Sequence, residues 1–463
     1  MAKSLDPTDW PAFRALGHRL LDEMMDYMEQ ARERPAWRPL PQETRSALRE
    51  ALPMEPQGEE RACAAFLEHV LPYPQGSTHP RFWGWVQGSG TPLGMVADMM
   101  ASGMNPMLAG FQQAPAVVEK QVLEWLAELM AFPDDASGVL CSSGTMANFL
   151  GLAVAMREWA GSGRVYCSDE THGWMRKAAA LLRLDVRRIP VDGEFRLSVP
   201  ALRVALEEDR ATGIVPVCVV ANAGTVNTGA IDPLEELGLL CAAQGLWLHV
   251  DGAFGALAHL SPALRPLLEG LPRADSLAFD LHKWFSAPID CACLLTRHAA
   301  QHRATFASTP SYMAPTDRGI LAGGVPFADL GIDLTRYFKA LKVWLSLKAY
   351  GVRHHAAVIE QNVKDAQCFA EQIDTHAEFE LLAPASLNIV CFRYAPARLP
   401  AGRLDAVNEE LLLRLQESGV AVLSSTILRG QFALRMANVN HRTQPEDFEL
   451  LLAALLEIGA VLS

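Results

Sequence analysis

Residues 274–285 read Ala-Asp-Ser-Leu-Ala-Phe-Asp-Leu-His-Lys-Trp-Phe, which places Lys283 at the end of an apolar, strand-like run. A second apolar run follows at residues 289–295. A lysine at the end of a buried strand is costly unless its charge is paired or its amine is used chemically. Burial lowers the pKa of an amine, and the neutral amine can then form a Schiff base with an aldehyde. A buried lysine by itself is more often paired or snorkelling, so the rest of the chain decides its role.

Short apolar strands alternate with helical stretches around this segment. The strands are predicted at residues 138–141, 165–168, 215–220, 246–250 and 276–279. The helices between them are predicted at residues 96–104, 116–130 and 147–160. This alternation, with buried and Val-rich strands, is typical of an α/β domain that has a mostly parallel sheet.

The sequence predicts three parts. Residues 1–85 form an N-terminal helical segment that includes an amphipathic helix over 9–33. Its helices make too small a core to fold alone, so they are expected to pack on another surface such as that of a partner subunit. Residues 86–345 form the large α/β domain. Helices at 334–373, 404–417 and 445–458 and strands at 388–393 and 432–436 predict that residues 346–463 form a small α+β domain.

Composition narrows the class of protein. The 463-residue chain has a formal net charge of −13, which argues against nucleic acid or an anionic membrane as the main partner. No apolar stretch approaches the ~18 residues of a membrane span, and the N-terminus lacks the order of a signal peptide. The nine scattered cysteines suit a reducing cytoplasm. Cys291 and Cys293 share a strand face, but no further ligands lie nearby, so we predict core packing and no metal.

Two further segments could serve an aldehyde cofactor with a phosphate and a pyridine ring. Residues 141–148, Cys-Ser-Ser-Gly-Thr-Met-Ala-Asn, join a predicted strand to a helix. Ser143, Gly144 and Thr145 would cradle a phosphate at the start of that helix. Asp251 ends another strand, where its carboxylate could keep a pyridinium nitrogen protonated. A plain N-cap is the alternative for both segments.

Two more residues complete the pattern. His172 follows the strand at 165–168, where its imidazole could stack on a flat ring, or simply be exposed at a helix start. Thr225 lies in the glycine-containing loop 221–230 and could bond the cofactor, or belong to an ordinary turn. Each of these residues lies at the end of a predicted strand. Along the chain they come in the order phosphate loop, His172, Thr225, Asp251 and Lys283. That order favours pyridoxal phosphate as the cofactor.

The sequence resembles the pyridoxal-phosphate-dependent group II amino-acid decarboxylases, especially the aromatic-L-amino-acid decarboxylase branch. The segments that carry the resemblance are residues 79–85, 91–98, 249–253, 282–284, 338–344 and 434–440. It runs from the N-terminal helices nearly to the C-terminus. The resemblance implies fold type I and a homodimer with active sites at its interface, where the N-terminal helices wrap over the partner.

The resemblance also implies roles for individual residues. Lys283 would form the Schiff base and Asp251 would be the pyridinium partner, with His172 and Ala253 on opposite faces of the ring. The remaining cofactor contacts would be Gly144 and Thr145 at the phosphate, Thr225 near the 3-hydroxyl, and His282 beside the phosphate and the Schiff base. Asp280 stands where the aromatic branch often has asparagine. A carboxylate there would repel the phosphate unless it is protonated or turned aside, so its role stays open.

Tyr312 is the expected proton donor. In the family a tyrosine on a mobile loop after the lysine protonates Cα once CO2 has left, and relatives with phenylalanine there tend to make aldehydes. Residues 300–325 have the small and turn residues of such a loop. Tyrosine therefore favours amine formation over aldehyde formation, although an aldehyde synthase remains an alternative.

The substrate is inferred from aromatic residues. Trp83, Trp85 and Phe111 precede or line the expected entrance and suit an aromatic amino acid such as Trp, Tyr, Phe or DOPA. Core or dimer packing is the alternative for them. Gly173 and residues 86–90 depart from the aromatic branch, so glutamate, aspartate or diaminobutyrate stays open as substrate. A transcription regulator built on this fold is disfavoured by the acidic helical N-terminus.

Overall fold

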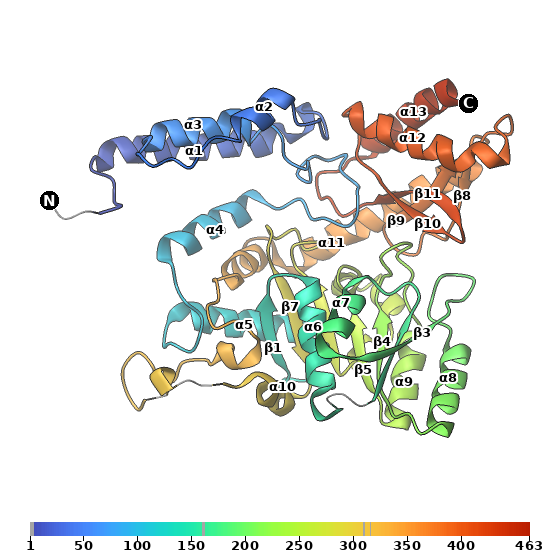
Figure 1. Ribbon diagram of the computed structural model, residues 1–463, viewed down its shortest axis with the longest axis horizontal. Coiled ribbons are helices and arrows are strands. Elements are labelled where there is room, and N and C mark those ends of the chain that lie inside the picture. The colour runs from blue at the N-terminus through green and yellow to red at the C-terminus, as the bar shows by residue number, and fades with distance from the viewer. Residues whose placement is uncertain (1–3, 160–162, 309–310, 315) are drawn as a thin grey trace.

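The computed structural model describes residues 4–159, 163–308, 311–314 and 316–463. Its centre is a seven-stranded sheet with the order β1-β7-β6-β5-β4-β2-β3 (Figure 1). The strands are β1 (Ser137–Cys141), β2 (Arg164–Ser168), β3 (Asp185–Ile189), β4 (Pro216–Asn222), β5 (Trp247–Asp251), β6 (Ser276–Asp280) and β7 (Ala292–Thr296). Strands β2 to β6 pair in parallel, and β7 runs antiparallel to β6 and β1. The predicted α/β fold with a mostly parallel sheet is confirmed.

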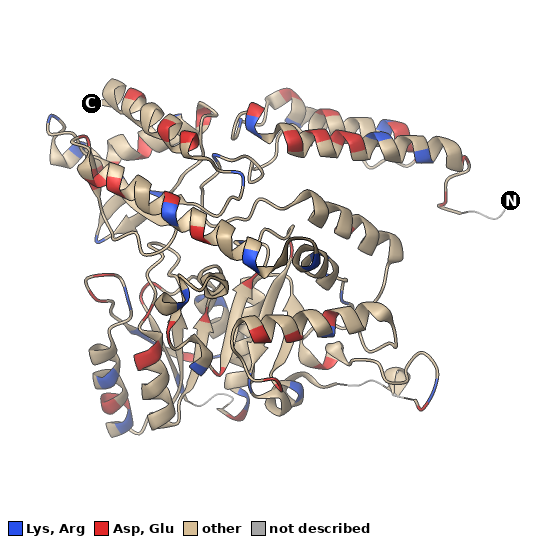
Figure 2. Cartoon of the chain, turned by 180° about the vertical axis from the view of Figure 1, so that it is seen from behind, with Lys and Arg blue, Asp and Glu red and all other residues tan. Residues whose placement is uncertain are grey.

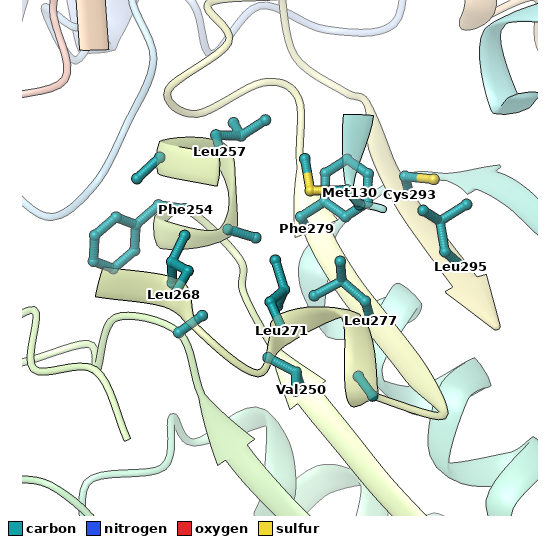
Figure 3. Close-up of a cluster of buried hydrophobic side chains, with 14 of the residues drawn as sticks. Met130, Val250, Phe254, Leu257, Leu268, Leu271, Leu277, Phe279, Cys293 and Leu295 are labelled. Carbon is teal, nitrogen blue, oxygen red and sulfur yellow. The ribbon is translucent and has the colours of Figure 1, made fainter. Parts of the chain in front are cut away.

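Helices cover both faces of this sheet. They are α4 (Pro92–Met104), α5 (Ala114–Leu129), α6 (Gly144–Ala155), α7 (Trp174–Leu182), α8 (Val199–Ala211), α9 (Leu234–Gln244) and α10 (Ala299–Phe306). Successive strand residues point to opposite faces. In β7, Cys293 and Leu295 join the cluster under α5, α8 and α9, whereas Ala292 and Leu294 pack with α6. Figure 3 shows part of the larger cluster, with Phe279 and Leu277 of β6 near Cys293 and Leu295. The sheet is therefore buried on both faces.

A smaller four-stranded antiparallel sheet has the order β10-β11-β9-β8. Its strands are β8 (Phe379–Leu381), β9 (Ile389–Tyr394), β10 (Ser424–Leu428) and β11 (Gln431–Ala437), and its helices are α12 (Leu404–Glu417) and α13 (Pro445–Leu462). The long helix α11 (Ala340–Thr375) leads into it and is kinked at Gly351, where φ is +73°. The predicted domain limit at residue 345 falls inside α11. The three domain ranges stay a prediction.

The N-terminal helices α1 (Trp10–Glu29), α2 (Gln42–Ala47) and α3 (Glu59–His69) form an arm beside the two sheets (Figure 1). An ion pair of 2.6 Å between Arg19 and Glu60 joins α1 to α3. Leu16 is buried on the predicted apolar face of α1, whereas Phe13 is exposed. Figure 2 shows many charged residues on this arm and on the other outer helices, whereas the strands of the large sheet are mostly uncharged.

Three strands were absent from the sequence-based prediction, namely β3, β8 and β10. Strand β3 lies at the edge of the large sheet and reads Asp-Val-Arg-Arg-Ile, so it lacks the apolar run of the central strands. Its Arg187 pairs with Asp209 of α8, which shows why charge is tolerated there. In the part of the chain that the structure describes, no helix combines the length and the apolar content needed to cross a bilayer.

Candidate active site

A cavity of about 430 Å³ opens where the carboxyl ends of β4, β5 and β6 face the small sheet. Ligands of open α/β sheets bind at this edge because the strand ends leave a crevice there. Eight of the nine predicted cofactor-binding residues line the cavity: Ser143, Gly144, Thr145, His172, Asp251, Ala253, His282 and Lys283. The structure thus brings together residues that are 140 positions apart in the chain, from 143 to 283.

Lys283 lies just after β6, and its Nζ atom is 2.7 Å from Oδ2 of Asp280. The neighbouring segment packs closely on this turn. A Cβ atom at Gly88 would collide with the backbone carbonyls of His282 and Lys283, so only glycine allows this approach. Residues 86 and 87 thereby reach the wall of the cavity. The lysine amine is held at the cavity wall beside a carboxylate.

Asp251, at the end of β5, is held by two donors. The indole N–H of Trp174 donates to Oδ2 at 2.5 Å, and the backbone N–H of Ala253 donates to Oδ1 at 3.1 Å. The carboxylate is almost fully buried. Both donors are neutral groups, so they fix the orientation of the carboxylate without adding a positive charge beside it. Asp251 can therefore present a negative charge to a positively charged ring nitrogen.

His172 lies at the rim of the cavity, just before α7. Its Nδ1 accepts a hydrogen bond of 3.2 Å from the backbone N–H of Trp174, which leaves the proton on Nε2 in the neutral ring. Although part of the ring stays exposed, partial burial lowers the pKa of His172, with the carboxylate of Asp251 acting in the opposite direction. A neutral imidazole at this position can lie against a flat ring without repelling a pyridinium charge.

The residues predicted to cradle a phosphate lie at the N-terminus of α6. Ser143 caps the helix by accepting a hydrogen bond from the backbone N–H of Met146 at 3.3 Å. A Cβ atom at Gly144 would lie 2.7 Å from Oδ2 of Asp280, so the glycine allows this carboxylate to approach the first turn of the helix. Backbone N–H groups and the helix dipole make such a corner an anion site.

These residues fit the pyridoxal phosphate that the sequence resemblance implies. Lys283 offers an amine, Asp251 a carboxylate for the ring nitrogen, and the first turn of α6 an anion site that a Cβ atom at Gly144 would fill. One group fits less well, because Asp280 puts a second carboxylate beside the same corner. The donor set as a whole suits a phosphate-bearing pyridine aldehyde.

Thr225 and Trp83, two of the predicted site residues, are buried outside the cavity. The Thr225 hydroxyl bonds to the Thr228 hydroxyl at 3.0 Å and is fully buried in its loop, while the neighbouring Gly224 and Val226 line the cavity. Trp83 corrects the expectation of a substrate contact. Its side chain has 0% exposure and stacks on Phe448 in the core of the small domain, with ring centroids 5.0 Å apart.

Trp85 does line the cavity, and its indole is 52% exposed at the mouth. Phe111 and Tyr312 do not line the cavity of their own chain. Tyr312 is 70% exposed in a short 3₁₀ turn, Ser311–Met313, and Figure 1 draws this stretch beyond α5 and α10, away from the small sheet. The roles of Phe111 and Tyr312 stay predictions.

Arg435 of β11 is a site residue that the sequence reasoning missed. Its guanidinium lines the cavity with 4% exposure and donates to the carbonyls of Asn227 and Trp85 and to the hydroxyl of Ser424. Nη2 has no hydrogen-bond partner within the described residues. Burial lowers the pKa of Arg435 to about 10, so the group stays charged at neutral pH. A charged residue inside the apolar run 432–436 was the available signal.

Comparisons with known proteins agree with this geometry. The family model of the pyridoxal-dependent decarboxylase conserved domain matches residues 41–395. An aromatic-L-amino-acid decarboxylase of Bacillus atrophaeus is 34% identical, covering 97% of this chain and 95% of that protein. An L-2,4-diaminobutyrate decarboxylase of Rhizobium meliloti is 35% identical, covering 78% and 74%.

A solved structure gives the same result. The tryptophan decarboxylase of Catharanthus roseus in complex with L-tryptophan superposes with a TM-score of 0.89 at 25% identity, covering 99% of this chain and 100% of that one. The relatives act on different amino acids, so they establish the class of reaction and leave the substrate open. The chain belongs to the pyridoxal-phosphate-dependent amino-acid decarboxylases, a family of lyases.

Proposed function

We propose that this enzyme decarboxylates an aromatic L-amino acid, of the Trp, Tyr, Phe or DOPA type, to the corresponding amine. The observation that carries the proposal is the distribution of charge in the cavity. Arg435 has a free N–H for one substrate carboxylate, and Trp85, Val226 and Phe254 line the same cavity. An apolar wall beside a single arginine suits an amino acid whose side chain is aromatic and uncharged.

The same charges speak against the alternatives. Arg435 is the one arginine among the described lining residues, so an acidic substrate would leave one of its two carboxylates without an arginine. The lining carboxylates are Asp251 and Asp280, and both would face the bound cofactor, Asp251 at its ring nitrogen and Asp280 at its phosphate. A diamino acid would therefore lack a free carboxylate for its second ammonium group.

Different residues of the cavity would serve different parts of the reaction. Bound pyridoxal phosphate supplies an electron sink for the pair released at the substrate Cα. Lys283 would hold the cofactor covalently and Asp251 would keep the proton on its ring nitrogen. His172 and Ala253 would flank the ring, and Ser143, Gly144 and Thr145 would hold the phosphate, with His282 beside it. Arg435 would fix the direction of the substrate carboxylate.

We infer that the working unit is a homodimer. The arm formed by α1 to α3 has little core of its own, and the exposed Tyr312 can act on Cα only if it reaches a cavity that is not beside it in the single chain. A second copy placed across the edge that carries Tyr312 would supply it. All nine cysteines are free of disulfides, which supports a reducing compartment such as the cytoplasm.

The cofactor assignment predicts a single labelled lysine. Borohydride reduction of the purified, loaded enzyme should attach the pyridoxyl group to Lys283, as read by peptide mass spectrometry. Asp251→Ala should weaken cofactor binding and reduce turnover by orders of magnitude, because a neutral pyridine is a poor electron sink. Label on another lysine would contradict the assignment. Lys342, which is buried and paired with Asp98, is the internal comparison.

The substrate proposal predicts a clear order in a panel of amino acids. CO2 release from Trp, Tyr, Phe and DOPA should exceed that from glutamate, aspartate and 2,4-diaminobutyrate by about 100-fold in kcat/KM. Trp85→Ala should lower kcat/KM for the aromatic substrates by about tenfold, because it removes an apolar surface at the cavity mouth. A preference for diaminobutyrate that survives Trp85→Ala would refute an aromatic substrate.

The role of Arg435 is tested with an uncharged residue of similar length. Arg435→Met should lower kcat/KM by about 100-fold or more, since a buried carboxylate would lose its charged partner. Arg393→Met is the matched control, because Arg393 lies on the neighbouring strand β9 but pairs with Glu380 outside the cavity. The control should keep wild-type kinetics. Equal losses in both variants would indicate damage to the small sheet and not a lost substrate contact.

If Tyr312 acts on the cavity of a second copy, two defective variants should complement each other. Lys283→Ala should be inactive, and Tyr312→Phe should release CO2 while forming aldehyde in the presence of oxygen. If Tyr312 serves the cavity of the second copy, mixed and reassembled dimers regain one intact site in each hybrid. Amine formation should then return to about a quarter of the wild-type level. Absence of any recovery, with hybrids confirmed by native mass spectrometry, would show that Tyr312 acts within its own chain or not at all.

A further inference from the structure

Asp280 is a buried carboxylate in the corner that is proposed to hold the phosphate. It has 2% exposure, and its Oδ1 atom has no hydrogen-bond partner within the described residues. A Cβ atom at Gly144 would lie 2.9 Å from Oδ1 and 2.7 Å from Oδ2, so the carboxylate faces the first turn of α6 directly. The anion site at the helix N-terminus therefore already faces a negative charge from the chain itself.

The charge of Asp280 is balanced by a single strong partner. In the described part of the chain its ion-pair contacts are Lys283 at 2.7 Å and the more distant His282 at 3.9 Å. Burial lowers the pKa of His282 and of His172, so neither ring supplies a positive charge at neutral pH. Burial, reinforced by the carboxylate of Asp280, raises the pKa of the nearby Cys141 thiol, which stays neutral. Lys283 is thus the cation that pairs with Asp280.

This balance is lost when the cofactor enters. A phosphate monoester brings a charge of about −1.5 to −2 into the same corner. The nitrogen of Lys283, which the proposed function uses as the covalent attachment point, can react only after its ammonium form loses a proton. A buried carboxylate without its cation, beside a second anion, is costly because neither charge is solvated.

We propose that Asp280 accepts a proton from the Lys283 ammonium group when the phosphate of the cofactor enters the cradle, and stays protonated in the loaded enzyme. The N–H bond at Nζ breaks, its electron pair remains on nitrogen, and an O–H bond forms at the carboxylate 2.7 Å away. The transfer produces a neutral amine that can attack the aldehyde and a neutral carboxyl group that can donate a hydrogen bond to a phosphate oxygen. This inference rests on the proposed attachment of the cofactor to Lys283.

One proton transfer thereby removes two obstacles. It generates the nucleophile, and it converts a repelling carboxylate into a donor that resembles the amide of an asparagine. The pairing of Asp280 with Lys283 in the described chain is the resting form of this exchange. Because the proton acceptor already contacts the amine, no hydroxide ion has to enter the buried site to deprotonate Lys283.

Infrared difference spectroscopy tests the proposal directly. Loading the wild-type apoenzyme with pyridoxal phosphate should produce the carbonyl band of a protonated carboxyl group, and carboxyl-¹³C aspartate labelling should shift it. The band should be absent from Asp280→Asn. Loading is checked independently by borohydride trapping on Lys283. A trapped, loaded enzyme without the band overturns the role of Asp280 alone, whereas failure to trap Lys283 overturns the proposed function and this inference with it.

The rate of attachment gives a second reading. At neutral pH, Asp280→Asn should attach the cofactor more slowly than the wild type by about tenfold or more, because its proton acceptor is gone. The gap should narrow as the pH rises, since hydroxide then deprotonates Lys283. Asp98→Asn is the matched control: Asp98 pairs with Lys342 at 3.0 Å and also has an oxygen without a partner, but lies outside the cavity. Attachment by Asp280→Asn at the wild-type rate would contradict the proposal.

Discussion

Charged groups buried between the carboxyl edge of the large sheet and the small sheet must each be compensated, and the site depends on this constraint. Asp251, Asp280 and Arg435 are all at least nine-tenths buried. An ionised group without a partner in such surroundings costs several kcal/mol, about as much as a folded domain can lose. Asp251 is compensated by neutral donors and Asp280 by Lys283, while Arg435 keeps one N–H free. In this site, Oδ1 of Asp280 and Nη2 of Arg435 have no partner within the described residues, so we expect ligand atoms to bind there.

A layer of uncharged hydrogen bonds beneath the cavity holds these charges in register. The amide of Asn148 donates to the carbonyl of Gly144 at 2.8 Å, so its oxygen accepts from Nε2 of His249 at 2.8 Å. Nδ1 of His249 then accepts from the hydroxyl of Ser276 at 2.7 Å, whose oxygen accepts from the indole of Trp247. Burial lowers the pKa of His249 to about 4, so the ring stays neutral. The relay ties the start of α6 to β5 and β6 without adding another charge.

The sequence predicted the parts of the site that are local in the chain. Lys283, Asp251 and the loop before α6 each follow an apolar strand directly, and parallel strands bring their carboxyl ends to one edge. Residues whose role depends on a distant partner escaped prediction. Trp174 matters because Asp251 lies opposite it, and Arg435 because the small sheet turns β11 toward the cavity. No periodicity in a single chain encodes either contact.

Trp83 and Trp85 show a second limit of prediction from the sequence. Trp83 and Trp85 are two positions apart and equally apolar, so composition cannot separate them. The backbone N–H of Trp83 bonds to the carbonyl of Val422, which fixes its side chain against Phe448 in the small core. Trp85 has a φ of +56°, a left-handed conformation that turns the chain toward the cavity. The left-handed backbone at Trp85 therefore directs this residue to the cavity, whereas Trp83 stays packed in the core of the small domain.

Phe111 and Tyr312 lie in neighbouring segments outside the cavity of their own chain. The segments that hold them are joined, because the backbone N–H of Gln112 donates to the carbonyl of Ile320 at 2.8 Å, so they form one edge of the molecule. An exposed tyrosine on an edge far from its own cavity gains nothing for the fold, since its ring buries little apolar area. The same ring is useful if a second copy presents its cavity to that edge. The geometry of a single chain thus explains why sequence reasoning could assign Tyr312 a chemical role but could not place it in the cavity.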